Sequence, residues 1–236
     1  MIRGALSLLD GLRLLLAERA LRSVLWRMLG LLVLLVVLLA AGVFWFSDYL
    51  AHLWLPQSDA WYWQVLGALA WLLAFALSLI SGAVAFVALA STAASPWLDM
   101  LAARTERLAG LTVDENPSSW AAQILQSLAN SLRPLLSLLG WGVAAAICML
   151  VPGIGQVAAT VIWGYAGIRF FNYETLDVPA SRRQWGFSRR REILRSERWF
   201  HLGFGGAAMA LMLVPALNVL ILPAAVVALS RHYAGR

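Results

Sequence analysis

The side chains in this sequence best suited to chemistry are arginines, which gather in two clusters. One cluster precedes the first long apolar run and consists of Arg13, Arg19, Arg22 and Arg27. The other cluster consists of Arg182, Arg183, Arg189, Arg190, Arg191, Arg195 and Arg198. A guanidinium group binds oxyanions in a bidentate manner, and a helix N-terminus adds backbone N–H donors. Arginine clusters also set membrane topology and attract anionic lipid headgroups, so both interpretations remain open here.

Motifs of enzymes are absent from the sequence. It contains no H-E-x-x-H, no G-x-S-x-G and no P-loop, and its glycine-rich stretch at 203–206 does not follow a predicted strand. The single cysteine, Cys148, lies in an apolar run without a second Cys or a His nearby. We therefore expect no catalytic residues, no metal site and no cofactor.

The composition indicates that lipid is part of the solvent. Of the 236 residues, 61% are apolar and 13% are charged, whereas soluble proteins have roughly 45–50% and about 25%. The formal charge of +6 comes from arginine alone, because the chain contains no lysine. A basic balance can indicate nucleic-acid binding, but these arginines flank apolar runs and fit membrane topology better. We expect no nucleic-acid partner.

The apolar pattern predicts an all-α membrane protein forming one integral membrane domain over residues 1–236. Two segments are long enough to be transmembrane helices, 28–46 and 61–90, because about twenty apolar residues cross the hydrocarbon core. Residues 1–27 are predicted to form a juxtamembrane helix. After the second span, Pro96 predicts a helix break and Gly110 a helix stop. Amphipathic cytoplasmic helices are predicted over 98–108 and 118–133, with Pro134 opening the next element.

Two further apolar regions, 134–171 and 201–230, are interrupted by similar turns, VPGIG and VPALN. The arms of the second region reach only roughly 20 Å, less than the roughly 30 Å hydrocarbon core. We predict two helical hairpins that enter the membrane partly and return to the same side; ordinary transmembrane pairs are the alternative. The residues that would shape these turns or a pore are Pro152, Gly153, Gly155, Pro215, Asn218 and Pro223.

The distribution of arginines predicts the topology. The connecting stretch 47–60 contains no arginine, so we expect it outside the cell. Both termini, residues 91–133 and the basic segment 172–200 would then be cytoplasmic. Buried ionisable residues, which mark proton-coupled pumps, are not found within the predicted spans, whereas a passive pore needs none.

Six segments occur in the same order as in a known family. They are SPWLDMLAARTERLAG at 95–110, VPGIGQ at 151–156, NYETLD at 172–177, FSRRREILRSER at 187–198, LGFG at 202–205 and LVPALNVLILPAAVVAL at 213–229. In these segments the sequence resembles the CysZ family of bacterial inner-membrane sulfate permeases and its wider etoposide-induced-protein relatives. The resemblance implies two long transmembrane helices, two partly penetrating hairpins, a homo-oligomer, and sulfate uptake for cysteine synthesis.

The same resemblance directs attention to the arginines before the first span. The family places sulfate near a P-G-[IL]-R-R element, which here reads Glu18-Arg19-Ala20-Leu21-Arg22. Arg22 matches in place, Arg19 replaces the glycine, Arg27 replaces a later proline, and the stretch is predicted to be continuous helix. We therefore predict an anion channel or permease with sulfate or a related oxyanion bound by Arg22, and by Arg19 and Arg27. The alternative is a non-transporting scaffold or lipid-interacting protein that binds anionic lipids.

Overall fold

The computed structural model describes residues 1–54, 61–111 and 136–234, and its regular secondary structure over these residues is entirely α-helical. This confirms the all-α prediction for the described part of the chain. The helices are α1 (Ile2–Ala17), α2 (Arg19–Trp54), α3 (Trp61–Leu108), a segment Leu136–Cys148, α5 (Ile154–Arg182), α6 (Phe187–Ser196), α7 (Arg198–Met212) and α8 (Pro215–His232). They form two compact units, Val24–Trp97 and Met1–Ser23 with Leu98–Arg236.

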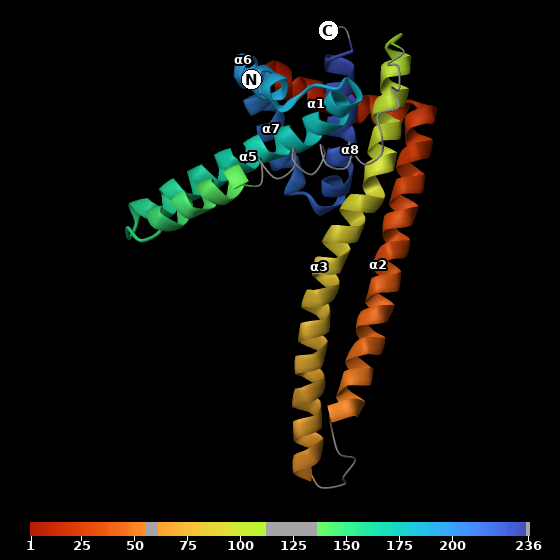
Figure 1. The fold of residues 1–236 in the computed structure, drawn as a ribbon, viewed down its shortest axis with the longest axis vertical. Helices are drawn as coiled ribbons and strands as arrows, with labels where there is room; N and C mark the ends of the chain where they lie inside the picture. The colour runs from red at the N-terminus through yellow and green to blue at the C-terminus, as the bar shows by residue number, and fades with distance from the viewer. Residues whose placement is uncertain (55–60, 112–135, 235–236) are drawn as a thin grey trace. The chain divides into compact units, whose positions relative to one another are not determined.

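The unit Val24–Trp97 is a pair of long apolar helices, the major parts of α2 and α3 (Figure 1). Phe44 and Phe75 pack with ring centroids 5.6 Å apart, and Gly82 lets α3 approach Val43 closely. Within these helices, Arg19–Leu50 and Val65–Ala83 are long and apolar enough to cross a membrane. Both predicted spans are thereby found as candidate membrane spans.

Helix α3 differs from the prediction at Pro96. The helix continues through this proline to Leu108, so the predicted break is wrong. A proline removes one backbone hydrogen bond, and the rest of a long helix can continue around that defect. Gly110 has φ +81°, which confirms the predicted helix stop. The predicted helix over 118–133 and Pro134 lie outside the described residues.

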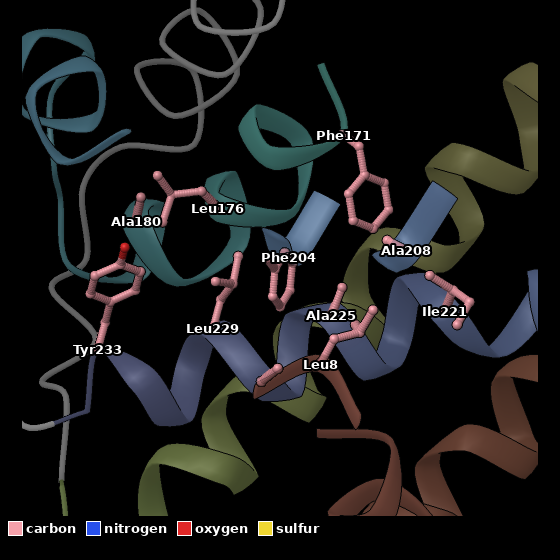
Figure 2. Packing of buried hydrophobic residues seen from close by; sticks show 11 residues of the cluster. Leu8, Phe171, Leu176, Ala180, Phe204, Ala208, Ile221, Ala225, Leu229 and Tyr233 are labelled. Carbon is pink, nitrogen blue, oxygen red and sulfur yellow. The ribbon is translucent and has the colours of Figure 1, made fainter. Parts of the chain in front are cut away.

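Helix α1 is an integral part of the other unit, where it packs against α7 and α8. Two glycines permit the close approach. A Cβ at Gly4 would lie 2.0 Å from the Phe200 carbonyl oxygen, and one at Gly11 would lie 2.6 Å from that of Ala224. Leu8, between the two glycines, is fully buried in the same interface (Figure 2). The segment predicted as juxtamembrane therefore contributes to a folded core.

Replacing Gly11 with alanine tests this packing. Because the added Cβ would meet the Ala224 oxygen and the Ala228 Cβ, both at 2.6 Å, we expect Gly11→Ala to lower the free energy of unfolding by about 1–2 kcal/mol. Gly164→Ala is the matched control, since nothing lies within 4 Å of its added Cβ. It should be neutral or stabilise by up to about 1 kcal/mol. Thermal unfolding in detergent micelles measures both; equal effects would contradict the close packing.

Two helix–turn–helix hairpins occupy the regions where hairpins are predicted. Leu136–Cys148 runs alongside the start of α5, with the Trp141 and Tyr165 rings 5.7 Å apart (Figure 1). Gly153 precedes α5 with φ +81°. At Gly155 a Cβ would lie 1.9 Å from the Cys148 carbonyl oxygen, so the turn requires a glycine there. Helices α7 and α8 form the second hairpin. How deeply either hairpin enters a membrane stays a prediction.

The core of this unit lies where α5, α7, α8 and α1 meet (Figure 2). Its buried side chains come from all four helices and include Leu8, Phe171, Leu176, Phe204, Ile221, Leu229 and Tyr233. Helix α5 supplies part of this core because it continues to Arg182, well past residue 171. The segment 172–200 is therefore helical and packed over much of its length, and it begins as an extension of the first hairpin.

Candidate anion-binding site

The first arginine cluster lies at a break between α1 and α2. Helix α1 ends at Ala17, and Glu18 adopts an extended conformation with φ −77° and ψ 118°. The Arg22 amide then donates to the Glu18 carbonyl at 2.9 Å, which starts α2. The expectation of a continuous helix through residues 18–22 is wrong. The chain turns here without the Pro-Gly pair, because α1 is docked on α7 and α8 through Gly4 and Gly11.

Arg19 and Arg22 lie in the first turn of α2, and both are exposed. Their spacing of three residues places them on neighbouring positions of one helix face. The first amides of a helix have no carbonyl partner within the helix and point toward its N-terminus. Arg22 Nη1 lies 3.5 Å from the Leu16 carbonyl oxygen, at the end of α1. The amides of Leu21 and Arg22 donate to the Glu18 carbonyl, so two cations share this turn with the amides of Arg19 and Ala20.

A third arginine reaches the same turn from α3. Arg104 Nη1 donates to the Ala20 carbonyl at 2.6 Å and to Ser23 Oγ at 3.2 Å. Ser23 Oγ in turn donates to the Ala20 carbonyl at 2.9 Å. Arg104 stands 84 residues from Ala20 in the sequence, so no local pattern could have identified it. Arg104 as a whole residue is half-buried.

The third arginine predicted for this site and the residues predicted for the turns or a pore lie elsewhere. Arg27 is exposed and belongs to the unit Val24–Trp97, so the structure does not join it to Arg19 and Arg22. The residues predicted for turns lie in the two hairpins, at their tips for the most part (Figure 1). Pro152 and Gly153 precede α5 and Gly155 lies in its first turn, Pro215 and Asn218 open α8, and Pro223 is buried farther along α8.

The second arginine cluster is partly internal. Arg182 Nε and Arg183 Nη1 each lie 2.9 Å from a carboxylate oxygen of Glu106, whose side chain is 1% exposed. Burial lowers the pKa of Arg183, an effect that outweighs the opposing influence of Glu106. These contacts attach the end of α3 to α5. They are incompatible with the interpretation that Arg182 and Arg183 bind lipid headgroups.

Arg190 is a second internal member of this cluster. It pairs with Asp177 and also donates to the Trp185 carbonyl at 2.8 Å and to Ser181 Oγ at 3.1 Å. These contacts close the loop between α5 and α6. Other arginines of the cluster remain exposed: Arg189, Arg191, Arg195 and Arg198. Lipid attraction therefore remains an option for these four alone.

A buried chain of hydrogen-bonded polar side chains connects α5, α7 and α8. His201 Nδ1 lies 3.1 Å from Asn172 Oδ1, and His201 Nε2 lies 3.0 Å from the Tyr233 hydroxyl. Asn172 uses its amide N–H groups to donate to the carbonyls of Ile168 and His201. Its Oδ1 therefore accepts from a protonated Nδ1, which leaves Nε2 without a hydrogen beside the Tyr233 hydroxyl. Burial lowers the pKa of His201 to about 4.

The outer end of this chain is Glu197, the residue between α6 and α7. Its Oε2 lies 3.1 Å from His232 Nε2 and 3.3 Å from the Tyr233 hydroxyl. Burial also lowers the pKa of His232 and raises that of Tyr233. These contacts join the start of α7 to the end of α8, which are the two ends of the second hairpin. Among the described residues, no three His, Cys, Asp or Glu side chains are grouped so that they could hold a metal ion.

Comparison with known proteins finds relatives over most of the chain. A family model described as sulfate transporter CysZ/etoposide-induced protein 2.4 matches residues 7–223. A sulfate transporter CysZ from Pectobacterium atrosepticum is 30% identical over 201 residues, covering 82% of this chain and 72% of that protein. Another from Pseudomonas syringae pv. tomato is 28% identical over 200 residues, covering 81% and 78%.

A third relative, a sulfate transporter CysZ from Pseudomonas fluorescens, is 33% identical over 144 residues, covering 60% of this chain and 57% of that protein. These relatives are named as transporters rather than as enzymes. The matches span 57–78% of their lengths. The family model covers most of the sequence, including the α1–α2 break, both candidate spans, the first hairpin and the second hairpin as far as residue 223. The chain is therefore a membrane protein of the sulfate transporter CysZ/etoposide-induced protein 2.4 family.

Proposed function

We propose that this protein is an anion channel or permease of the bacterial inner membrane that passes sulfate into the cell. The observation that carries the proposal is the group of arginines at the first turn of α2, in a chain whose relatives are named sulfate transporters. Arg19, Arg22 and Arg104 together with the carboxylate of Glu18 give this turn a formal charge of +2. That charge matches a divalent oxyanion, and helix N-termini favour anions.

Arg22 is the principal anion contact in this proposal, and Arg19 assists it from the adjacent position. Arg22 reaches back toward the Leu16 carbonyl. That contact is long, and it caps an α1 end that has no basic residue in its last turn. A purely structural capping role for Arg22 is the competing explanation. The two roles are distinguished by whether a variant that lacks the Arg22 guanidinium binds sulfate more weakly.

Arg22→Ala should weaken sulfate binding by about 10- to 100-fold, because charge-assisted hydrogen bonds contribute about 1.5–3 kcal/mol. Isothermal titration of sulfate into the purified protein in detergent measures this. Arg13→Ala is the matched control, since Arg13 is an exposed arginine of α1 with only a weak pair 3.9 Å away. If Arg22→Ala binds sulfate as tightly as the wild type, Arg22 is a helix cap and not an anion contact.

The path of the anion is proposed to run near the turns of the two hairpins. Proline and glycine turns in the two hairpins, from Pro152 to Gly155 and around Pro215, would place helix ends and backbone groups near a pore. The passage would be passive, both termini would be cytoplasmic, and the chain would act as a homo-oligomer. Sulfate entering by this route would supply cysteine synthesis.

A lipid-interacting scaffold is the second candidate function. It is favoured by the four exposed arginines around α6 and the start of α7, where Arg198 lies over the Trp199 ring at 5.3 Å. An exposed tryptophan next to arginines is typical of a membrane interface. This candidate predicts binding to anionic vesicles without any sulfate flux. The proposed transport function predicts flux whether or not the lipids are anionic.

A further inference from the structure

Arg104 occupies a position that helix electrostatics would normally disfavour. The N-terminal end of a helix carries a partial positive charge and attracts acidic side chains. The first turn of α2 itself contains no acidic residue, although Glu18 directly precedes it. Arg104 brings a third guanidinium to this turn through the Ala20 carbonyl and Ser23 Oγ. Local rules are broken in this way chiefly at functional sites.

The structure also fixes Arg104 firmly in place. Glu106, two residues farther along α3, is held between Arg182 and Arg183 by ion pairs of 2.9 Å on each side. Thr105 Oγ1 donates to the Leu101 carbonyl at 2.8 Å, and the side chains of Thr105 and Glu106 are both buried. The last turns of α3 are thereby anchored to α5. The anchored end of α3 therefore holds the charge of Arg104 at the break between α1 and α2. An electrostatic binding site requires charges that are held in place in this way.

We propose that Arg104 positions the first turn of α2 and sets the preference of the site for divalent over monovalent anions. The inference rests on the proposed function, because it assigns a specificity-determining residue to the same site. Arg104 holds the Ala20 carbonyl and the Ser23 hydroxyl, which orients the turn that carries Arg19 and Arg22. Its own charge raises the formal charge of the site from +1 to +2.

The charge dependence of this role separates it from a purely structural one. Coulomb energy is proportional to the charge of the ligand, so removing one fixed cation weakens binding of a divalent anion twice as much in free energy as that of a monovalent anion. If Arg104→Gln weakens sulfate binding by about tenfold, nitrate binding should weaken only about threefold. Arg104→Lys keeps the charge and should retain the wild-type ratio of the two affinities.

The experiment is a titration of sulfate and of nitrate into wild type, Arg104→Gln, Arg104→Lys and a control variant in detergent, at fixed ionic strength. Arg107→Gln is the control, because Arg107 is an exposed cation in the last turn of the same helix. It should change the affinity for sulfate by less than twofold. Arg104→Met removes the charge while keeping the apolar stem, and replaces the Gln variant if that protein is not recovered folded.

The outcomes distinguish this inference from the proposed function. A selective loss of sulfate affinity in the neutral variants, with the ratio restored in Arg104→Lys, supports the inference. An unchanged ratio of the two affinities in the neutral variants overturns the inference. It leaves the proposed function intact if the wild type binds sulfate and Arg22→Ala binds it more weakly. Binding of neither anion by the wild type overturns the proposed function, and the role of Arg104 with it.

Discussion

Replacing Glu106 with alanine should destabilise the protein by about 3–5 kcal/mol, the effect expected when one partner of a buried ion pair is removed. Glu106 is 1% exposed and faces Arg182 and Arg183, whose side chains are only 15% and 11% exposed. Without the carboxylate, two neighbouring guanidinium groups would remain largely buried and would lose the anion that they share. Burial already lowers the pKa of Arg183 with Glu106 present. Thermal and denaturant unfolding in detergent micelles measure the change.

Glu192→Ala is the matched control for this prediction. Glu192 also pairs with an arginine, Arg189, at 3.1 Å, but both side chains are more than 60% exposed. Surface pairs of this kind contribute between 0 and about 1 kcal/mol, so the variant should unfold like the wild type. If Glu106→Ala and Glu192→Ala destabilise equally, the attachment of α3 to α5 through Glu106 is not significant for stability.

The second large effect is a loss of stability at acidic pH caused by His201. The pKa of this ring is about 4 in the folded protein and 6.5 in the unfolded chain, so the unfolded state binds protons more readily. A lowered pKa of a base contributes stability that is present above pH 6.5 and is lost as the pH falls toward 4. The full loss is about 3 kcal/mol, and about 1 kcal/mol of it should appear between pH 7.5 and 5.5.

The measurement is the midpoint of thermal unfolding in this pH range for the wild type and His201→Gln. Glutamine does not titrate, so the variant should start less stable and show a weaker dependence on pH. His232 contributes in the same direction, because burial lowers its pKa as well, and it titrates in both proteins. Parallel pH profiles for the two proteins would show that His201 is not the titrating group.

Features that depend on local sequence were predicted well. The uncharged runs of α2 and α3 are found as candidate membrane spans, because length and apolar content alone determine them. Gly110 ends α3 because a left-handed residue is needed there. The ordered segments from 95 to 229 also identified the family, which the family model confirms. The spans and the helix stop are each complete within a short stretch of sequence, whereas the family is indicated by several short segments in order.

Features that depend on distant residues could not be predicted. Residues 18–22 have good helix propensity, and the break at Glu18 arises because α1 docks on the second hairpin through Gly4 and Gly11. The partners of the arginines are equally remote, since Arg182 is 76 residues from Glu106. For the same reason, Arg104 gave no local signal of its contact with Ala20.

The burial of His201 could not be predicted from the sequence for a different reason. As a single histidine at the edge of an apolar segment, it was indistinguishable from an interfacial residue. The structure buries it between Asn172 and Tyr233, which lie 29 and 32 residues away. Only the packing of α5, α7 and α8 against one another brings these groups together. A motif search for catalytic or metal-binding patterns does not detect a series of hydrogen-bonded side chains of this kind.

The central claim is that this protein passes sulfate across a membrane. Uptake of radiolabelled sulfate into liposomes containing the purified full-length protein tests it most directly. Neutral and anionic lipid compositions, with empty liposomes as the blank, separate transport from lipid binding. We predict uptake well above the blank in both compositions, reduced by Arg22→Ala at low sulfate concentration. Uptake by the wild type that is no greater than that of empty liposomes would contradict the claim.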